Sequence, residues 1–69
     1  MSEVVLEVNG KPISLCVGVT VADLVESMKL SPTGVAIAVN QVVIPTSERQ
    51  RTCLKKDDRV EIIHAVGGG

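Results

Sequence analysis

The last three residues of the chain, Gly67, Gly68 and Gly69, are the part of the sequence best suited to chemistry. With glycine at about 7% of residues in an average protein, three at fixed positions occur by chance at roughly 3 in 10,000. A glycine tail has no Cβ atoms, so it can extend in a narrow groove and leaves the terminal carbonyl open to attack. The sequence therefore directs attention to the carboxylate of Gly69.

A carboxylate becomes a good acyl donor only when one of its oxygens becomes a leaving group. A partner enzyme that uses ATP and magnesium can convert it to a mixed anhydride with AMP. A sulfur nucleophile held nearby can then displace AMP and leave a thiocarboxylate. The alternative is an inert tail, because glycine-rich ends are often frayed termini.

The rest of the chain shows no acid–base pair, nucleophile–histidine arrangement, metal-ligand spacing or phosphate loop. We therefore expect a protein cosubstrate and not an enzyme, with no bound cofactor and no metal. Net charge is −1, and Phe, Tyr and Trp are absent, which argues against nucleic acid as a partner. The longest apolar stretch, Val35–Val39, is far short of the roughly 20 residues that span a membrane, so no membrane segment is predicted.

Alternation of apolar and polar residues predicts two strands, near residues 4–8 and 11–17, joined by Asn9 and Gly10. Asn-Gly is the strongest two-residue hairpin signal, because both residues tolerate the positive φ of a type I′ turn. The chain is therefore expected to open with a β-hairpin. Val4, Leu6 and Val8 are predicted to share one face of the first strand. One face of the second strand is predicted to carry Ile13, Leu15 and Val17.

Thr20 is placed to cap a helix, with its hydroxyl accepting the backbone N–H of Asp23. The helix is expected to run for about ten residues, until Pro32 disfavours the helical conformation at Ser31. Its apolar stripe is predicted to be Val21, Leu24, Val25 and Met28.

The second half of the chain predicts three further strands, near 35–39, 42–44 and 59–64. Between the last two, Ser47 is a candidate cap for one helical turn, and Leu54 is expected to anchor the segment to the core. The predicted fold class is α+β: a ubiquitin-like β-grasp, with a mixed four- to five-stranded sheet packed on one helix and its first and last strands parallel. Residues 1–66 are expected to form the domain and residues 67–69 a flexible tail.

The chain resembles the ThiS family, the ubiquitin-like sulfur carriers of thiamine biosynthesis, over essentially its whole length. Gly67 departs from family members that have Ala at this position. The segments that carry the resemblance are Val8-Asn9-Gly10, Thr20-Val21-Ala22-Asp23-Leu24, residues 35–40, Val43-Ile44-Pro45, Lys56-Asp57-Asp58 and residues 65–69.

The resemblance implies that a ThiF-like adenylyltransferase, using ATP and magnesium, activates Gly69, with Gly68 as its small neighbour. It implies that a cysteine desulfurase or other sulfur donor supplies sulfur, which thiazole synthase takes into the thiazole ring of thiamine. Carriers for molybdopterin, cysteine or tRNA thiolation stay open as alternatives. So do an interaction module with an inert tail and a modifier that conjugates to lysine.

Alternation also places three apolar residues on the sheet face away from the helix, provided that the strand register allows it: Val5, Val42 and Ile63. Together with Val66, Gly67 and Gly68, these residues are the predicted partner-binding surface.

Other residues are given no site role. Cys16 and Cys53 are interpreted as reduced, buried or half-buried thiols of a cytoplasmic protein that lacks a signal peptide, and His64 as a strand-surface residue. A loose positive group is expected to be a solvated face: Arg49, Arg51, Lys55 and Lys56.

Overall fold

The N-terminal hairpin forms as the sequence predicts. The computed structural model describes residues 2–30 and 34–64. In it, β1 (Glu3–Val8) pairs antiparallel with β2 (Lys11–Cys16). Asn9 and Gly10 have φ of 53° and 84°, which confirms the predicted turn. Val17 was expected to end the second strand on the same face as Ile13 and Leu15, but it lies beyond β2 and is 59% exposed.

Helix α1 (Val21–Ser27) begins at the predicted cap. The Thr20 hydroxyl accepts the Asp23 N–H at 3.1 Å, and the Asp23 carboxylate accepts the Thr20 N–H at 3.1 Å. The helix ends earlier than the expected ten residues, because Lys29 adopts φ of 58° and closes a left-handed C-terminal motif in which the Leu30 N–H donates to the Val25 carbonyl. Met28 therefore lies past the last full turn and is 40% exposed instead of completing the apolar stripe.

A second tight hairpin joins β3 (Val35–Val39) to β4 (Val42–Ile44). Asn40 and Gln41 form its turn, with φ of 52° and 70°. A single 3₁₀ turn, η1 (Thr46–Glu48), follows Pro45 and has no side-chain cap, so the prediction that Ser47 caps this turn is wrong. The turn at Asp57, with φ of 67°, leads into β5 (Arg59–His64).

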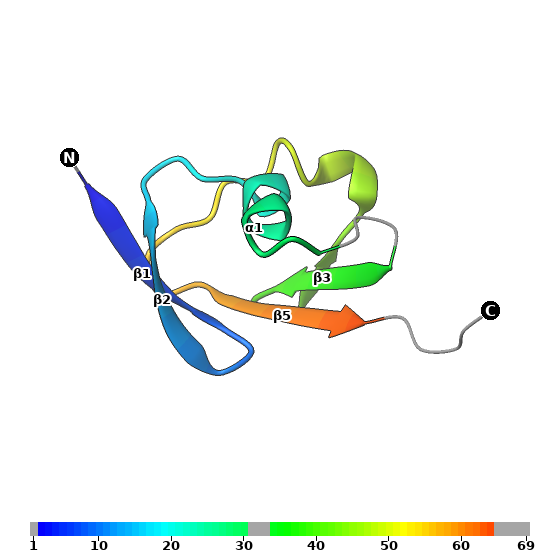
Figure 1. Cartoon of the computed structure of the whole chain (residues 1–69), viewed down its shortest axis with the longest axis horizontal. Coiled ribbons are helices and arrows are strands. Elements are labelled where there is room, and N and C mark those ends of the chain that lie inside the picture. Colours follow the sequence, from blue (N-terminus) through cyan, green and yellow to red (C-terminus); the bar gives the residue numbers. More distant parts are fainter. Residues whose placement is uncertain (1, 31–33, 65–69) are drawn as a thin grey trace.

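The five strands form one mixed sheet in the order β2-β1-β5-β3-β4. Strand β5 lies in the centre, antiparallel to β3 and parallel to β1, which it meets at the pairs Glu7 with Arg59 and Val8 with Val60. Figure 1 shows the sheet below and α1 above it. One helix lying across such a sheet, with the first and last strands parallel, is the ubiquitin-like β-grasp expected from the sequence.

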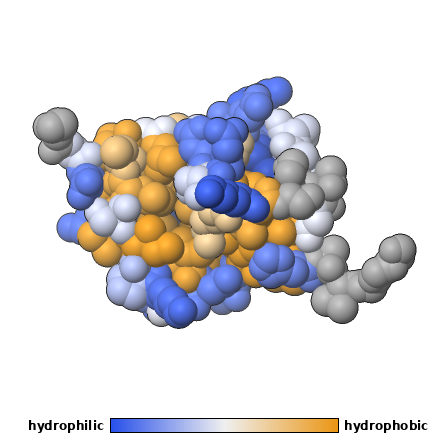
Figure 2. Space-filling view, viewed as in Figure 1, coloured by the Kyte–Doolittle hydropathy of each residue, from blue (hydrophilic) through white to orange (hydrophobic). Residues whose placement is uncertain are grey.

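The core lies between α1 and the sheet and consists of aliphatic side chains. Leu54, from the irregular segment before β5, is 3% exposed and completes the core as predicted. In the space-filling view, apolar residues gather over the β1–β2 side and across the middle of the molecule (Figure 2). Among the described residues, no helix is long and apolar enough to cross a membrane. The buried hydrophobic residues are Leu6, Val8, Val21, Leu24, Val25, Ile37, Ala38, Leu54, Val60 and Ile62.

Candidate functional site

Strand β5 carries the chain toward its C-terminal end. Val60 and Ile62 are 1% and 6% exposed and hold the strand in the core, whereas Glu61, Ile63 and His64 are exposed. His64 is the last residue that the structure describes. The predicted acceptor Gly69 and its neighbours Val66, Gly67 and Gly68 therefore lie outside the described residues, and so do Ser31 and Pro32. What the structure defines is the strand that precedes the tail and the surfaces around it.

Two asparagines at hairpin turns hold β5 in place. The Asn9 side-chain oxygen accepts the Ile62 N–H at 2.8 Å, and the Asn40 side-chain oxygen accepts the Arg59 N–H at 3.0 Å. Asn40 also donates from Nδ2 to the Asp58 carboxylate at 3.0 Å. These contacts join turns that are distant in sequence to the strand that leads into the tail. The hairpin signal predicts the turn at Asn9 and Gly10, but not the hydrogen bonds that the two asparagine side chains make to β5.

Replacing Asn9 with Gly should therefore weaken β5 without removing the turn. Glycine adopts the positive φ of this position readily but cannot accept the Ile62 N–H, so we expect a loss of about 1 kcal/mol in the free energy of unfolding. Urea denaturation measures this loss, and hydrogen exchange should show faster exchange at the Ile62 amide. Unchanged exchange at Ile62 would show that the side-chain hydrogen bond does not hold the strand.

The sheet face away from α1 carries an exposed apolar patch near the end of β5. Directly opposite residues of neighbouring antiparallel strands share a face, and Ile63 pairs with Ala36, while Val43 pairs with Ala38. Ile63 and Val43 are 58% and 65% exposed. We call the surface formed by the exposed Ala36, Val43 and Ile63, with the buried Ala38 beneath them, the open-face patch. Glu61 pairs with Ala38 and adds a carboxylate to it.

The strand register confirms the predicted sheet face for Val5 and Ile63 but not for Val42. Val42 is 61% exposed but pairs with Val39, which packs on the core, so it belongs to the helix side of the sheet and not to the open face. Val5 is 53% exposed and pairs with Ser14 on the open face. It lies six strand positions from the level of Ile63, about 20 Å along the strands. The predicted single patch of Val5, Val42 and Ile63 is therefore wrong as a geometric unit.

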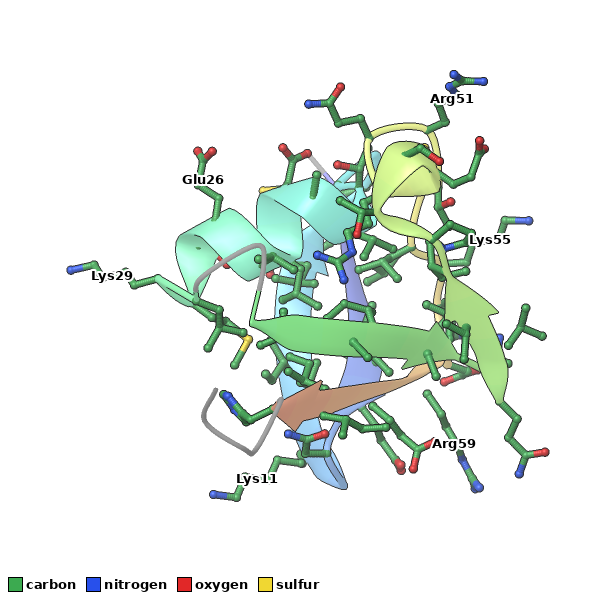
Figure 3. The ribbon with its side chains drawn as sticks, turned by 90° about the vertical axis from the view of Figure 1, so that its right-hand side faces the viewer. Lys11, Glu26, Lys29, Arg51, Lys55 and Arg59 are labelled. Atoms are coloured by element: carbon green, nitrogen blue, oxygen red, sulfur yellow. The ribbon has the colours of Figure 1, made fainter. Side chains whose placement is uncertain are left out.

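Arg49 is the residue that sequence reasoning placed least well. It was grouped with the solvated cations, but its side chain is buried at 5% exposure, and Nη2 donates to the Val35 carbonyl at 2.7 Å. The Arg49 carbonyl accepts the Ala22 N–H at 3.1 Å, so one residue links the η1 segment to β3 and α1. Arg51 and Lys55 point outward from the body, as expected of a solvated face (Figure 3).

The remaining candidate groups do not come together. Cys16 and Cys53 are free thiols, as expected, but both are exposed, which corrects their interpretation as buried or half-buried residues. Within residues 2–30 and 34–64, no three His, Cys, Asp or Glu side chains lie close enough to hold a metal ion. A shallow groove of about 490 Å³ lies between α1 and η1, with Val25 and Leu30 on one side and Thr46 and Ser47 on the other.

Comparison with known proteins agrees with the fold and covers almost the whole chain. A crystal structure of the thiamine biosynthesis protein ThiS from Geobacter metallireducens superposes with a TM-score of 0.82 at 29% identity, covering 94% of this chain and 99% of that one. A thiazole synthase of Magnetococcus marinus is 30% identical over 64 residues, which are 93% of this chain but only 20% of that protein. The protein ycf40 of Pyropia yezoensis is 26% identical, with 99% and 96% of the two chains covered. The sequence profile of the ThiS family matches residues 4–69, and the chain therefore belongs to the ThiS family.

Proposed function

We propose that this chain is the sulfur carrier of thiamine biosynthesis and that it works through the carboxylate of Gly69. The observation that carries the proposal is the family match over residues 4–69, which includes the three terminal glycines. The central position of β5 supports it, because the strand leading to the tail is fixed in the core by Val60 and Ile62 while its outer face stays exposed. The protein itself is a cosubstrate whose chemistry is completed by partner enzymes.

The proposed sequence of reactions starts with attack of the Gly69 carboxylate on the α-phosphorus of ATP, which forms an acyl adenylate and releases pyrophosphate. A ThiF-like adenylyltransferase with magnesium catalyses this step. The terminal sulfur of a cysteine desulfurase persulfide, or sulfide from another donor, then attacks the acyl carbon and displaces AMP. With the persulfide the product is an acyl disulfide, whose S–S bond a thiol cleaves, leaving the thiocarboxylate on Gly69 and a disulfide on the donor. Thiazole synthase finally accepts the sulfur. The name of the Magnetococcus relative, which contains a segment similar to this chain, supports that last partner.

The direct test is the intact mass of the chain after incubation with ATP, magnesium, the adenylating enzyme and a sulfide source. Exchange of one oxygen for sulfur should add about 16 Da, and the gain should require ATP. A chain that keeps its mass while the enzyme consumes ATP on a control carrier would contradict the proposal.

We further propose that the open-face patch docks the adenylating enzyme. A glutamate at Ile63 should slow adenylation by roughly tenfold or more, because burying an unpaired carboxylate in an apolar contact is costly. The matched control is Val42→Glu, which places the same group at a residue of similar exposure on the opposite face. Pyrophosphate exchange measures the rate, and thermal melting checks that both variants fold. Equal rates for the two variants would remove the patch from the docking surface.

A further inference from the structure

One edge of β5 is open just before the tail. Strand β1 pairs with β5 only at the beginning of β5. There the Glu7 N–H donates to the Asp58 carbonyl and the Asn9 N–H donates to the Val60 carbonyl, both at 2.9 Å. The chain then turns at Asn9 and Gly10 into β2. Figure 1 shows β5 continuing past this hairpin toward the C-terminal end, with β3 beside it. From Ile62 onward, β5 therefore has a strand on one side only among the described residues.

The Asn9 side chain supplies the last contact on that side. In a parallel ladder the next hydrogen bond would run from the Ile62 N–H to the main chain of β1, but here it goes to the Asn9 side-chain oxygen at 2.8 Å. Backbone groups of a strand alternate in direction, so the Ile62 carbonyl and the His64 N–H point to the same open side. The opposite side is occupied by β3, to which the odd-numbered residues of β5 are directed, as the bond from the Asn40 N–H to the Arg59 carbonyl shows.

We propose that this edge, from Ile62 to His64, accepts an added strand from the adenylating partner. The inference rests on the function proposed above. A carbonyl and an N–H spaced two residues apart along an exposed strand match the main chain of another extended segment, as in strand addition to a sheet edge. The added segment takes the sheet position that β1 leaves at Asn9, and it runs directly beside the residues that lead to Gly69.

Chain geometry favours the adenylating enzyme as the occupant. Gly69 lies five positions after His64, and five residues reach at most about 18 Å. An enzyme that holds the Gly69 carboxylate against ATP therefore has His64 at the mouth of its groove. Main-chain pairing at this edge fixes the direction in which the tail leaves the domain, which is the orientation that activation of the carboxylate requires.

The first test is amide hydrogen exchange on the unmodified chain, free and in complex with the adenylating enzyme. The His64 amide should exchange quickly in the free chain, because it is an exposed edge group, and at least about tenfold more slowly in the complex. Unchanged exchange at His64 in a saturated complex would overturn the inference. Protection of the His64 amide by thiazole synthase but not by the adenylating enzyme would also overturn it. Protection that rises with the concentration of the free chain would overturn it too, because it would assign the edge to a second copy.

The second test compares His64→Pro with His64→Ala. Both remove the imidazole, but only proline removes the N–H, and this N–H is not part of the ladder with β3, so both variants should fold. We expect affinity for the enzyme to fall about tenfold in the proline variant relative to the alanine variant. Equal affinities would overturn strand addition. If the unmodified chain gains no sulfur in the mass assay, the proposed carrier function is wrong. If it gains sulfur but the two variants bind the enzyme equally, only the strand addition is wrong.

Discussion

A chain that lacks Gly68 and Gly69 is expected to fold normally and to gain no sulfur. The described fold ends at His64, so the deletion leaves the core and all five strands intact. The new terminal carboxylate falls about 7 Å short of its former position. Since a misplacement of about 1 Å can cost 10²-fold in rate, adenylation should fall below detection. Intact mass after incubation with ATP, the adenylating enzyme and sulfide gives the result.

The matched control is the double substitution Gly68→Ala and Gly69→Ala, which keeps the full length of the tail but replaces its last two glycines. It keeps a carboxylate at residue 69 but adds two Cβ atoms, so any activity it retains measures how narrow the partner's groove is. An interaction module with an inert tail would keep its biological activity after the deletion, which would contradict the carrier. A lysine modifier would lose activity too, but it would reveal itself as isopeptide adducts in cell extracts.

Replacing Ile37 with Ala should be the most destabilising of the substitutions considered. Its side chain is fully buried in the middle of β3, beneath the helix and beside Ile62. Truncation leaves a cavity in a core without aromatic rings, and we expect a loss of about 2–5 kcal/mol in the free energy of unfolding. Because the free energy of unfolding of a native protein is only about 5–15 kcal/mol, the unfolded population should rise strongly.

Urea denaturation measures this loss, and Val43→Ala is the matched control. Val43 lies in the neighbouring strand β4 but is 65% exposed on the open face, so its truncation should change stability by about 0.5 kcal/mol or less. Similar losses for the two variants would contradict the burial of Ile37 in the core.

Local rules predicted the parts of the fold that local chemistry determines. Asn9 with Gly10 and Thr20 with Asp23 form the expected turn and cap, because both depend on residues no more than three positions apart. The helix end was misplaced because Lys29, without a glycine signal, adopts a left-handed conformation. The buried contact from Arg49 to the Val35 carbonyl joins segments 14 residues apart, and no local pattern reports it.

The candidate site has two parts, the terminal glycines and the proposed docking surface, and the sequence predicts them to different degrees. The prediction that Gly69 is the reactive end rests on residue type alone, and it stays a prediction because the terminal glycines lie outside the described residues. The docking surface depends on strand register, and a shift of one residue moves a side chain to the other face. Alternation within β4 could not decide between Val42 and Val43, because both are valines. Only the pairing of Val42 with Val39 decides the face.

The parallel pairing of β1 with β5 has a consequence for synthesis in the cell. A ribosome makes β1 first and β5 last, and the central position of the sheet stays empty until Arg59 to His64 have emerged. Until then Leu6, Val8 and Ile37 have no strand between them, and a nascent chain that stops early exposes these side chains to chaperones and proteases. A chain that stops before Arg59 therefore lacks the central strand and cannot complete this sheet, whereas a chain that loses only residues after His64 keeps all five strands.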